Sequence, residues 1–155
     1  MSSQYELRKL EPSDIPSCEA VLRALPEWFG IESALNEYVN CLHQLPAVVA
    51  TMSDQVIGFI ALEDHNEHSS EIHVMAVHPE HHRFGVGRTL VDACAFRCQL
   101  LHCKWLLVRT IGPSSSDPHY AKTRKFYEAI GFTPLFESNE LWGATNPCLV
   151  MVRSI

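Results

Sequence analysis

The chain carries two periodicities of apolar residues, and each predicts one kind of secondary structure. Apolar residues that recur every three or four positions predict helices, whereas alternating or short continuous apolar runs predict strands. The helical spacing occurs at residues 12–25, 31–42, 86–101 and 118–130. The strand pattern occurs at residues 4–10, 47–52, 56–62, 71–77, 105–108, 133–137 and 148–152.

Turn residues separate these segments. Glu27–Gly30 predicts an aromatic loop, Ser53–Gln55 a hairpin turn and Asp64–Ser70 a polar turn. Gly131 follows the last helical segment and is the glycine that typically ends a helix. The order β-α-α-β-β-β-α-β-α-β-β predicts one α/β domain over residues 1–155, with antiparallel central hairpins and about four helices.

Composition narrows the class of protein. The 155 residues are 46% hydrophobic and 19% charged, which is typical of a globular domain with its own core. Twelve Lys and Arg stand against 18 Asp and Glu, and this net charge of −6 argues against nucleic acid as a general partner. No apolar run is long enough to span a bilayer or to form a signal peptide at the start. We therefore expect a cytoplasmic protein without a membrane partner.

The six cysteines and nine histidines suggest metal binding at first sight, but their spacing does not favour it. No C-x-x-C pair is present. Cys94 and Cys98 lie in an apolar helical run, which predicts buried thiols that act as small hydrophobic groups. His78, His81 and His82 surround a proline in a turn, where their rings would splay apart. We expect no metal, and keep a histidine-rich metal-binding protein as an alternative.

The most informative segment is a glycine-spaced loop that joins a predicted strand to the longest predicted helix. Gly85 and Gly87 have no Cβ, so a phosphate could approach the backbone closely. Successive N–H groups at a helix start form an anion site, to which Arg83 and Arg88 add positive charge. The segment lacks the Gly-Lys-Ser/Thr of a Walker loop and the third glycine of the dinucleotide fingerprint.

The segment His82-Arg83-Phe84-Gly85-Val86-Gly87 resembles the acyl-CoA-binding motif Q/R-x-x-G-x-G/A of the GCN5-related N-acetyltransferase (GNAT) superfamily, with His82 in place of Gln or Arg. A second block, Phe126-Tyr127-Glu128-Ala129-Ile130-Gly131-Phe132, resembles the family's F-Y-x-x-x-G-F segment. The resemblance implies a GNAT fold, in which a central mixed, mostly antiparallel sheet is splayed open and acetyl-CoA lies in the cleft.

The resemblance also implies which residues bind acetyl-CoA as the co-substrate. The end of the strand would pair through its backbone with the pantetheine arm, and the glycine-spaced loop would cradle the pyrophosphate. The backbone N–H of Val77 would stabilise the tetrahedral intermediate. The implied cofactor residues are Met75, Ala76, Val77, His82, Arg83, Phe84, Gly85, Val86, Gly87 and Arg88.

Acetyl transfer to an amine also requires proton transfers. An amine with a pKa of about 10 must lose a proton before it attacks the thioester, and the leaving thiolate benefits from a proton donor. Tyr127 matches the tyrosine that serves as the acid in many family members. Glu71, fourteen residues before Gly85, matches the glutamate base of the family's histone-acetyltransferase branch. His73 or a water molecule are alternative bases, and a packed Tyr127 and a water-facing Glu71 are the non-catalytic alternatives.

The predicted function is therefore an acetyl-CoA-dependent N-acetyltransferase that acts on a primary amine of a small molecule, a peptide or a protein. The resemblance implies that acceptor contacts come from the first helices and the late loops, and Trp28 and Phe29 are the candidates there, with ordinary packing as the alternative. A non-catalytic acyl-CoA-binding or regulatory module is the alternative function. Because dimers are the commonest soluble assembly, a homodimer is the oligomer we expect if one forms.

Overall fold

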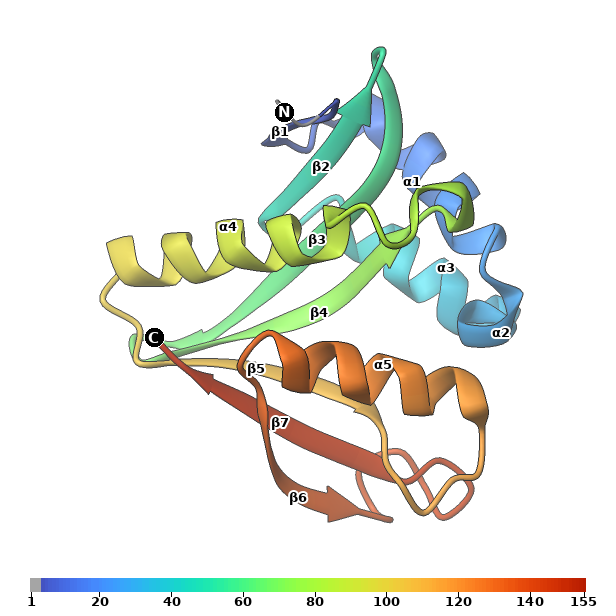
Figure 1. Ribbon diagram of the computed structural model, residues 1–155, viewed down its shortest axis with the longest axis vertical. Coiled ribbons are helices and arrows are strands. Elements are labelled where there is room, and N and C mark those ends of the chain that lie inside the picture. The colour runs from blue at the N-terminus through green and yellow to red at the C-terminus, as the bar shows by residue number, and fades with distance from the viewer. Residues whose placement is uncertain (1–3) are drawn as a thin grey trace. The chain divides into compact units, whose positions relative to one another are not determined.

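The computed structural model describes residues 4–155 and places them in an α/β fold (Figure 1). The chain forms two compact units. Unit 1 contains the described residues up to Glu63 together with His73–Phe96, and unit 2 contains Asp64–Ile72 and Arg97–Ile155. The long strands β3 and β4 and the helix α4 run through both units.

The predicted elements are present, with small shifts at their ends. The helices are α1 (Ile15–Arg23), α2 (Pro26–Phe29), α3 (Glu32–Cys41), α4 (Val86–Leu100) and α5 (Pro118–Ala129), with 3-10 turns at Pro12–Asp14 and Pro79–His81. The strands are β1 (Glu6–Lys9), β2 (Ala47–Met52), β3 (Gln55–Asn66), β4 (Ser69–Val77), β5 (Trp105–Ile111), β6 (Thr133–Ser138) and β7 (Cys148–Ser154).

The strands follow the order β1-β2-β3-β4-β5-β7-β6. The pairs β1–β2, β2–β3, β5–β7 and β6–β7 are antiparallel, and β4 pairs with β5 in parallel, with Ser69–Ile72 opposite Trp105–Val108. The prediction of a mixed, mostly antiparallel sheet is therefore confirmed. Parallel neighbours need a crossover connection, and α4 supplies it between β4 and β5.

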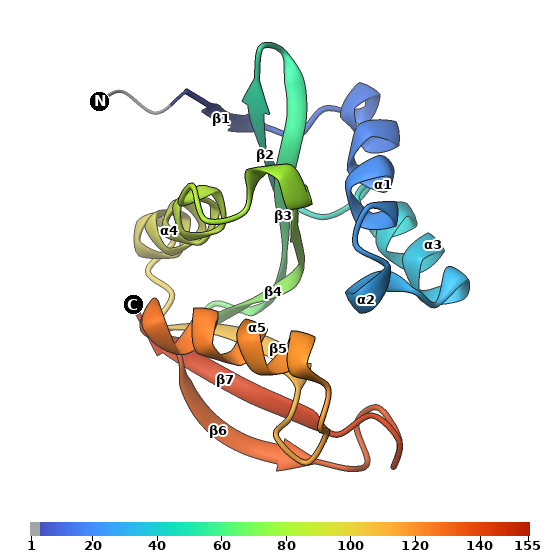
Figure 2. The ribbon, with the colours of Figure 1, turned by 45° about the vertical axis from the view of Figure 1, so that its right-hand side comes forward.

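Unit 1 buries its apolar residues on both faces of its strands. Helices α1 to α3 lie on one face of β2 and β3 and helix α4 lies on the other (Figure 2). The core on the α1–α3 side includes Leu22 and Leu35 from the helices and Phe59 and Val74 from the strands, all at most 5% exposed. Burial of side chains of this size typically contributes about 1.5–3 kcal/mol each.

In unit 2, α5 lies over β5 and β7 (Figures 1 and 2). The helix begins at Asp117, whose carboxylate accepts a hydrogen bond from the N–H of His119 at 2.9 Å. It ends before Gly131, which has a φ of +101° and donates its N–H to the carbonyl of Glu128. The predicted helix-ending glycine is therefore confirmed.

Two predicted turns are wrong in detail. Glu27–Gly30 is not a loop, because Pro26 opens the short helix α2 and Gly30 follows its end. The polar stretch Asp64–Ser70 is mostly strand, and only Glu67 and His68 lie between β3 and β4. The Asn66 side chain accepts hydrogen bonds from the N–H groups of His68 and Ser69, which stabilises a tight turn that hydrophobic pattern alone does not reveal.

Candidate active site

The loop that follows β4 has the backbone conformation of an anion site. Two of its residues lie in the left-handed region, Arg83 with a φ of +68° and Gly85 with a φ of +80°. A left-handed conformation is unfavourable for a residue with a Cβ, so its presence at Arg83 indicates that the surrounding structure enforces it. Alternation of left-handed and other residues turns successive N–H groups toward one concave side.

The start of α4 is fixed by Thr89. The carbonyl of Gly85 accepts hydrogen bonds from the N–H of Thr89 at 3.0 Å and from its hydroxyl at 2.9 Å. The hydroxyl of Tyr5 lies 2.9 Å from the same Thr89 Oγ1 and holds it from the other side. Gly85 is therefore the residue that caps the helix, and its carbonyl is fully engaged.

The amides that follow Gly85 have no acceptor within the helix. The first turn of a helix leaves its N–H groups without intrahelical partners, and here these belong to Val86, Gly87 and Arg88. The helix dipole adds partial positive charge at the same place. The Arg83 and Arg88 side chains are exposed beside it. The loop combines amide donors, dipole and cationic side chains, as a pyrophosphate requires.

His82 closes this loop onto the strand that precedes it. Its Nε2 lies 2.7 Å from the carbonyl oxygen of Val77, and because a carbonyl can only accept, Nε2 carries the proton and donates it. The residue that departs from the Q/R-x-x-G-x-G/A motif therefore fixes the loop through its side chain. This contact was not predicted, since sequence spacing does not show which way a side chain turns.

The backbone at the end of β4 alternates between two edges. The N–H of His78 donates to the carbonyl of Ile57 at 2.8 Å, so His78 turns its polar groups toward β3. Neighbouring residues of a strand point their N–H and C=O groups in opposite directions, so Val77 and Met75 turn theirs away from β3. This is the orientation that backbone pairing with an extended ligand requires. Ala76, between them, is buried.

Tyr127 lies on α5 with its ring packed between two phenylalanines. The ring centroids of Phe126 and Phe132 lie 5.3 and 5.4 Å away in edge-to-face geometry, and Tyr127 is only 6% exposed. Burial raises the pKa of the Tyr127 phenol well above its usual value. The group therefore keeps its proton at neutral pH and can only donate it. The packing beside Phe126 expected of a non-catalytic Tyr127 is therefore present. This packing does not prevent the phenol from keeping its proton.

Glu71 does not face water. It is 7% exposed, and its Oε1 accepts a hydrogen bond from His65 Nε2 at 2.8 Å and lies 3.4 Å from Arg109 Nε. The alternative of a solvent-facing glutamate is therefore wrong, because long-range pairing of β4 with β5 covers the side chain. The partners His65 and Arg109 were missed, since neither is near Glu71 in a pattern that periodicity detects.

His73, the alternative base, belongs to a separate cluster in unit 1. Its Nδ1 lies 3.5 Å from a carboxylate oxygen of Glu63, and its ring meets the ring of Tyr38 edge to face at 5.7 Å. Tyr38 in turn contacts Phe29 at 5.8 Å. Phe29 and Trp28 both come from α2 and pack, partly buried, against the core of unit 1. The ordinary packing expected as their alternative role is present.

The cysteines follow the structural expectation, but the expectation that the histidine rings splay apart is wrong for His78 and His81, whose ring centroids lie 6.1 Å apart in edge-to-face geometry. All six cysteines are free thiols, and Cys94 and Cys98 are buried, as predicted. Burial raises the pKa of the Cys98 thiol to about 11, which keeps it protonated at neutral pH. His78 uses Nδ1 to accept the N–H of Glu80. Within residues 4–155, no three His, Cys, Asp or Glu side chains are placed to hold a metal ion.

Comparison with known proteins identifies the class that this fold and loop define. Residues 44–134, more than half of the chain, match the family model described as an acetyltransferase (GNAT) domain. The chain therefore belongs to the GNAT family of acetyltransferases, and it is an enzyme of the N-acetyltransferase type. No curated protein matches the sequence.

Solved structures support the same fold. A GNAT-family protein from Desulfovibrio desulfuricans superposes with a TM-score of 0.85 at 19% identity, covering 97% of this chain and 98% of that one. The ribosomal-protein-S18-alanine N-acetyltransferase of Escherichia coli gives 0.78 at 15% identity, covering 97% and 94%. An aminoglycoside 6'-N-acetyltransferase complexed with coenzyme A gives 0.75 at 16% identity, covering 96% of both chains. None of the helices in residues 4–155 is long and apolar enough to cross a membrane.

Proposed function

We propose that this chain transfers the acetyl group of acetyl-CoA to a primary amine by direct attack in a ternary complex. The observation that carries the proposal is the anion cradle at the start of α4, where Gly85 caps the helix and Arg83 and Arg88 flank it. The residues of this cradle suit the pyrophosphate of coenzyme A. A pyrophosphate has two anionic phosphate groups, and the cradle offers them backbone amide donors and cationic side chains.

The remaining cofactor-binding residues come from the end of β4 and from the loop that follows it. The backbone of Met75, Ala76 and Val77 receives the pantetheine arm, and the Val77 N–H donates to the oxygen that becomes negative when the amine attacks. The loop from His82 to Arg88 holds the pyrophosphate, with Phe84, 70% exposed, beside it. Val86 is buried and anchors the helix start to unit 1.

The chemical step forms a C–N bond and breaks the C–S bond of the thioester. An alkylammonium with a pKa of about 10 is roughly 0.1% neutral at pH 7, so removal of its proton must accompany binding. The departing thiolate takes a proton from the Tyr127 hydroxyl, which is protonated at neutral pH. Glu71 is the base expected from the sequence. Its carboxylate is buried and contacts both His65 and Arg109, so it does not stand alone.

The acceptor is an amine that carries positive charge in solution. In unit 1 the acidic residues far outnumber the basic ones, whereas in unit 2 the two kinds are equal in number. A negative unit attracts a cation over long range and so raises its rate of encounter. Trp28 and Phe29 are the proposed aromatic contacts for it, although their packing in the core leaves only part of each ring exposed.

Two of the structures named above are named for different acceptors, an aminoglycoside and the alanine of ribosomal protein S18, so the acceptor must be found by experiment. The test is release of coenzyme A thiol from acetyl-CoA with spermidine, kanamycin, a peptide starting with alanine and a peptide with an internal lysine, with the acetylated product confirmed by mass spectrometry. Turnover with one of these amines supports the proposal. Binding of acetyl-CoA without turnover on any of them would favour the alternative, a non-catalytic acyl-CoA-binding module.

We further propose that residues 1–155 form one functional domain, that the protein works in the cytoplasm, and that any stable oligomer is a homodimer. Sedimentation of the purified protein measures the last of these directly.

A further inference from the structure

The ring of His82 reaches from the loop that follows β4 back to the strand itself. Its Nε2 donates to the carbonyl oxygen of Val77 at 2.7 Å. Val77 turns both its N–H and its C=O away from β3, and the proposed function assigns the N–H to the thioester oxygen. His82 therefore contacts one of the two outward groups of the residue that would hold the reacting carbonyl, and both residues belong to unit 1.

The peptide group that His82 contacts is also held from its other side. The Val77 carbonyl and the His78 N–H belong to one peptide, and this N–H donates to the Ile57 carbonyl of β3 at 2.8 Å. Hydrogen bonds on the two sides of one peptide group polarise it and strengthen each other. The contact therefore fixes His82, through this peptide, to β3 as well as to β4.

A 3-10 turn over Pro79–His81 separates His82 from the end of the strand. The N–H groups of the last residue of this turn and of His82 donate to carbonyls three residues earlier, at 2.9 and 3.3 Å. These backbone bonds shape the turn itself. The His82 side chain closes the turn onto β4, so it sets where the pyrophosphate loop begins relative to Val77.

The start of α4 is held by a different set of contacts. The Gly85 carbonyl accepts both the N–H and the hydroxyl of Thr89, and the Tyr5 hydroxyl lies 2.9 Å from Thr89 Oγ1. Loss of the His82 hydrogen bond should therefore leave the amides of the helix start in place. What it should release is their position relative to Val77.

We infer that His82 is the positioning residue that joins the two halves of the cofactor site, the strand end that receives the thioester and the loop that receives the pyrophosphate. The inference deepens the proposed function and rests on it. A ligand that spans both halves binds more tightly when they are already in the right relative position, because less ordering then opposes binding. A ligand that contacts only the helix start gains nothing from the hydrogen bond. His82 therefore favours an extended anionic cofactor over a simple phosphate.

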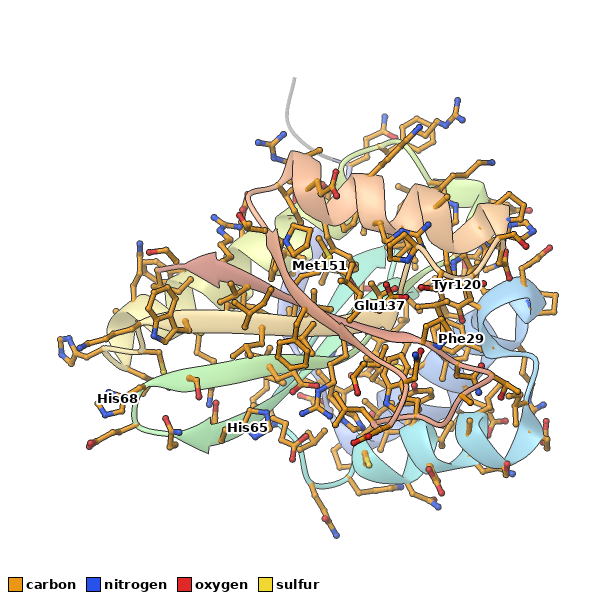
Figure 3. The ribbon with its side chains drawn as sticks, turned by 90° about the horizontal axis from the view of Figure 1, so that it is seen from below. Phe29, His65, His68, Tyr120, Glu137 and Met151 are labelled. Carbon is orange, nitrogen blue, oxygen red and sulfur yellow. The ribbon has the colours of Figure 1, made fainter. Side chains whose placement is uncertain are left out.

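Side-chain chemistry allows a paired test at this one position. Glutamine carries an amide N–H as far along its side chain as the Nε2 of histidine, whereas the shorter asparagine carries its amide at the position of Nδ1. His82→Gln can therefore donate to the Val77 carbonyl, and His82→Asn is too short to do so. One control is His81→Asn, in the same turn. The other is His68→Asn, at the hairpin turn that precedes β4, the opposite end of the strand from Val77 (Figure 3).

The measurement is the dissociation constant of acetyl-CoA by isothermal titration calorimetry, which needs no acceptor amine. His82→Asn should raise this constant about 3- to 10-fold, the equivalent of one net hydrogen bond. His82→Gln should rescue most of the affinity and stay within about 2-fold of wild type. Both control variants should match wild type.

Inorganic pyrophosphate, titrated in competition with acetyl-CoA, supplies the second readout. It contacts only the loop half of the site, so its dissociation constant should be the same for wild type and His82→Asn. A loss of fold or of loop shape in His82→Asn would weaken pyrophosphate as well. The comparison therefore separates positioning from a general structural defect.

Three results would overturn the inference. These are equal acetyl-CoA binding by His82→Asn and wild type, a His82→Gln variant as weak as His82→Asn, and pyrophosphate binding that weakens in His82→Asn by the same factor as acetyl-CoA binding. A wild-type protein in which pyrophosphate does not compete with acetyl-CoA refutes the pyrophosphate site of the proposed function instead. Failure of every amine in the thiol-release assay refutes the proposed acetyl transfer and leaves this binding test intact, so the failures are distinguishable.

Discussion

Replacement of Gly85 by alanine tests whether the backbone of the α4 cradle holds the cofactor. An added Cβ would have the hydroxyl of Tyr5 as its nearest neighbour at 3.8 Å, an ordinary contact, so no steric clash is expected. The φ of +80° is the difficulty, because a left-handed conformation costs a residue with a Cβ about 1–2 kcal/mol. Reduced freedom of the unfolded chain offsets about 0.4–1 kcal/mol of this. If the free loop kept this conformation, the net loss in the free energy of unfolding would be about 1 kcal/mol.

The effect on acetyl-CoA follows from where that strain is released. We expect the free loop to relax to a conformation that alanine prefers, so binding must restore the left-handed one at a cost of about 1–2 kcal/mol. The dissociation constant of acetyl-CoA should then rise about 5- to 30-fold. Gly143→Ala is the matched control, since Gly143 has a φ of +87°, nothing within 4 Å of its Cβ position and a place in the loop between β6 and β7.

Isothermal titration calorimetry and urea unfolding on both variants give the decisive comparison. Gly143→Ala should leave the dissociation constant of acetyl-CoA unchanged, whereas Gly85→Ala should raise it and change the free energy of unfolding little, because its free loop relaxes. Equal dissociation constants for the two variants would refute the assignment of the α4 start as the pyrophosphate site.

Two further substitutions test other parts of the molecule. Tyr127→Phe keeps the packing against Phe126 and Phe132 but removes the proton donor, so kcat should fall about 100-fold with acetyl-CoA affinity unchanged, as rapid-quench kinetics and calorimetry would show. Asp14→Asn should lower the free energy of unfolding by about 1–2 kcal/mol at pH 7, because it breaks the paired hydrogen bonds from Arg8 at 2.7 and 2.8 Å. Arg8 lowers the pKa of the Asp14 carboxyl, so this contribution is present above the ordinary carboxyl pKa and is lost as pH falls through the lowered one. Urea unfolding of both proteins from pH 7 to pH 2 should therefore show the difference disappearing in acid, and a constant difference would contradict the assignment.

Local signals predicted most of the fold. The positions of the helices and strands follow from apolar spacing, and Gly131 ends α5 because only glycine accepts a φ of +101° without strain. The glycine-spaced helix start was also predictable, since its amides and the two glycines are neighbours in sequence, and its binding of a pyrophosphate stays a prediction. The β3–β4 hairpin was predicted too short because polar contacts, such as that of Ser70 with Asp64, extend it beyond its apolar residues.

Side-chain contacts that depend on the pairing of strands could not be predicted from the sequence. The alternation along β4 placed Glu71 on a face, but its burial depends on the register of β4 against β5, which brings Leu107 opposite it. A shift of one residue would turn the side chain to the other face. His65 meets Glu71 only because the turn at Glu67 and His68 is tight. The chemistry of the predicted base therefore depends on long-range pairing, whereas the cofactor loop does not.

The acidic excess of unit 1 bears on how the start of α4 could recognise an anion. Unit 1 carries the acidic excess of the chain and also the proposed site for an anionic cofactor. Long-range attraction cannot bring coenzyme A there, so recognition must come from donors at contact distance, namely backbone amides, the helix dipole and two arginines. Backbone amides carry no net charge and leave the field of the unit negative. Under the proposed function, the same unit would hold a pyrophosphate at short range and still attract a cationic amine from solution.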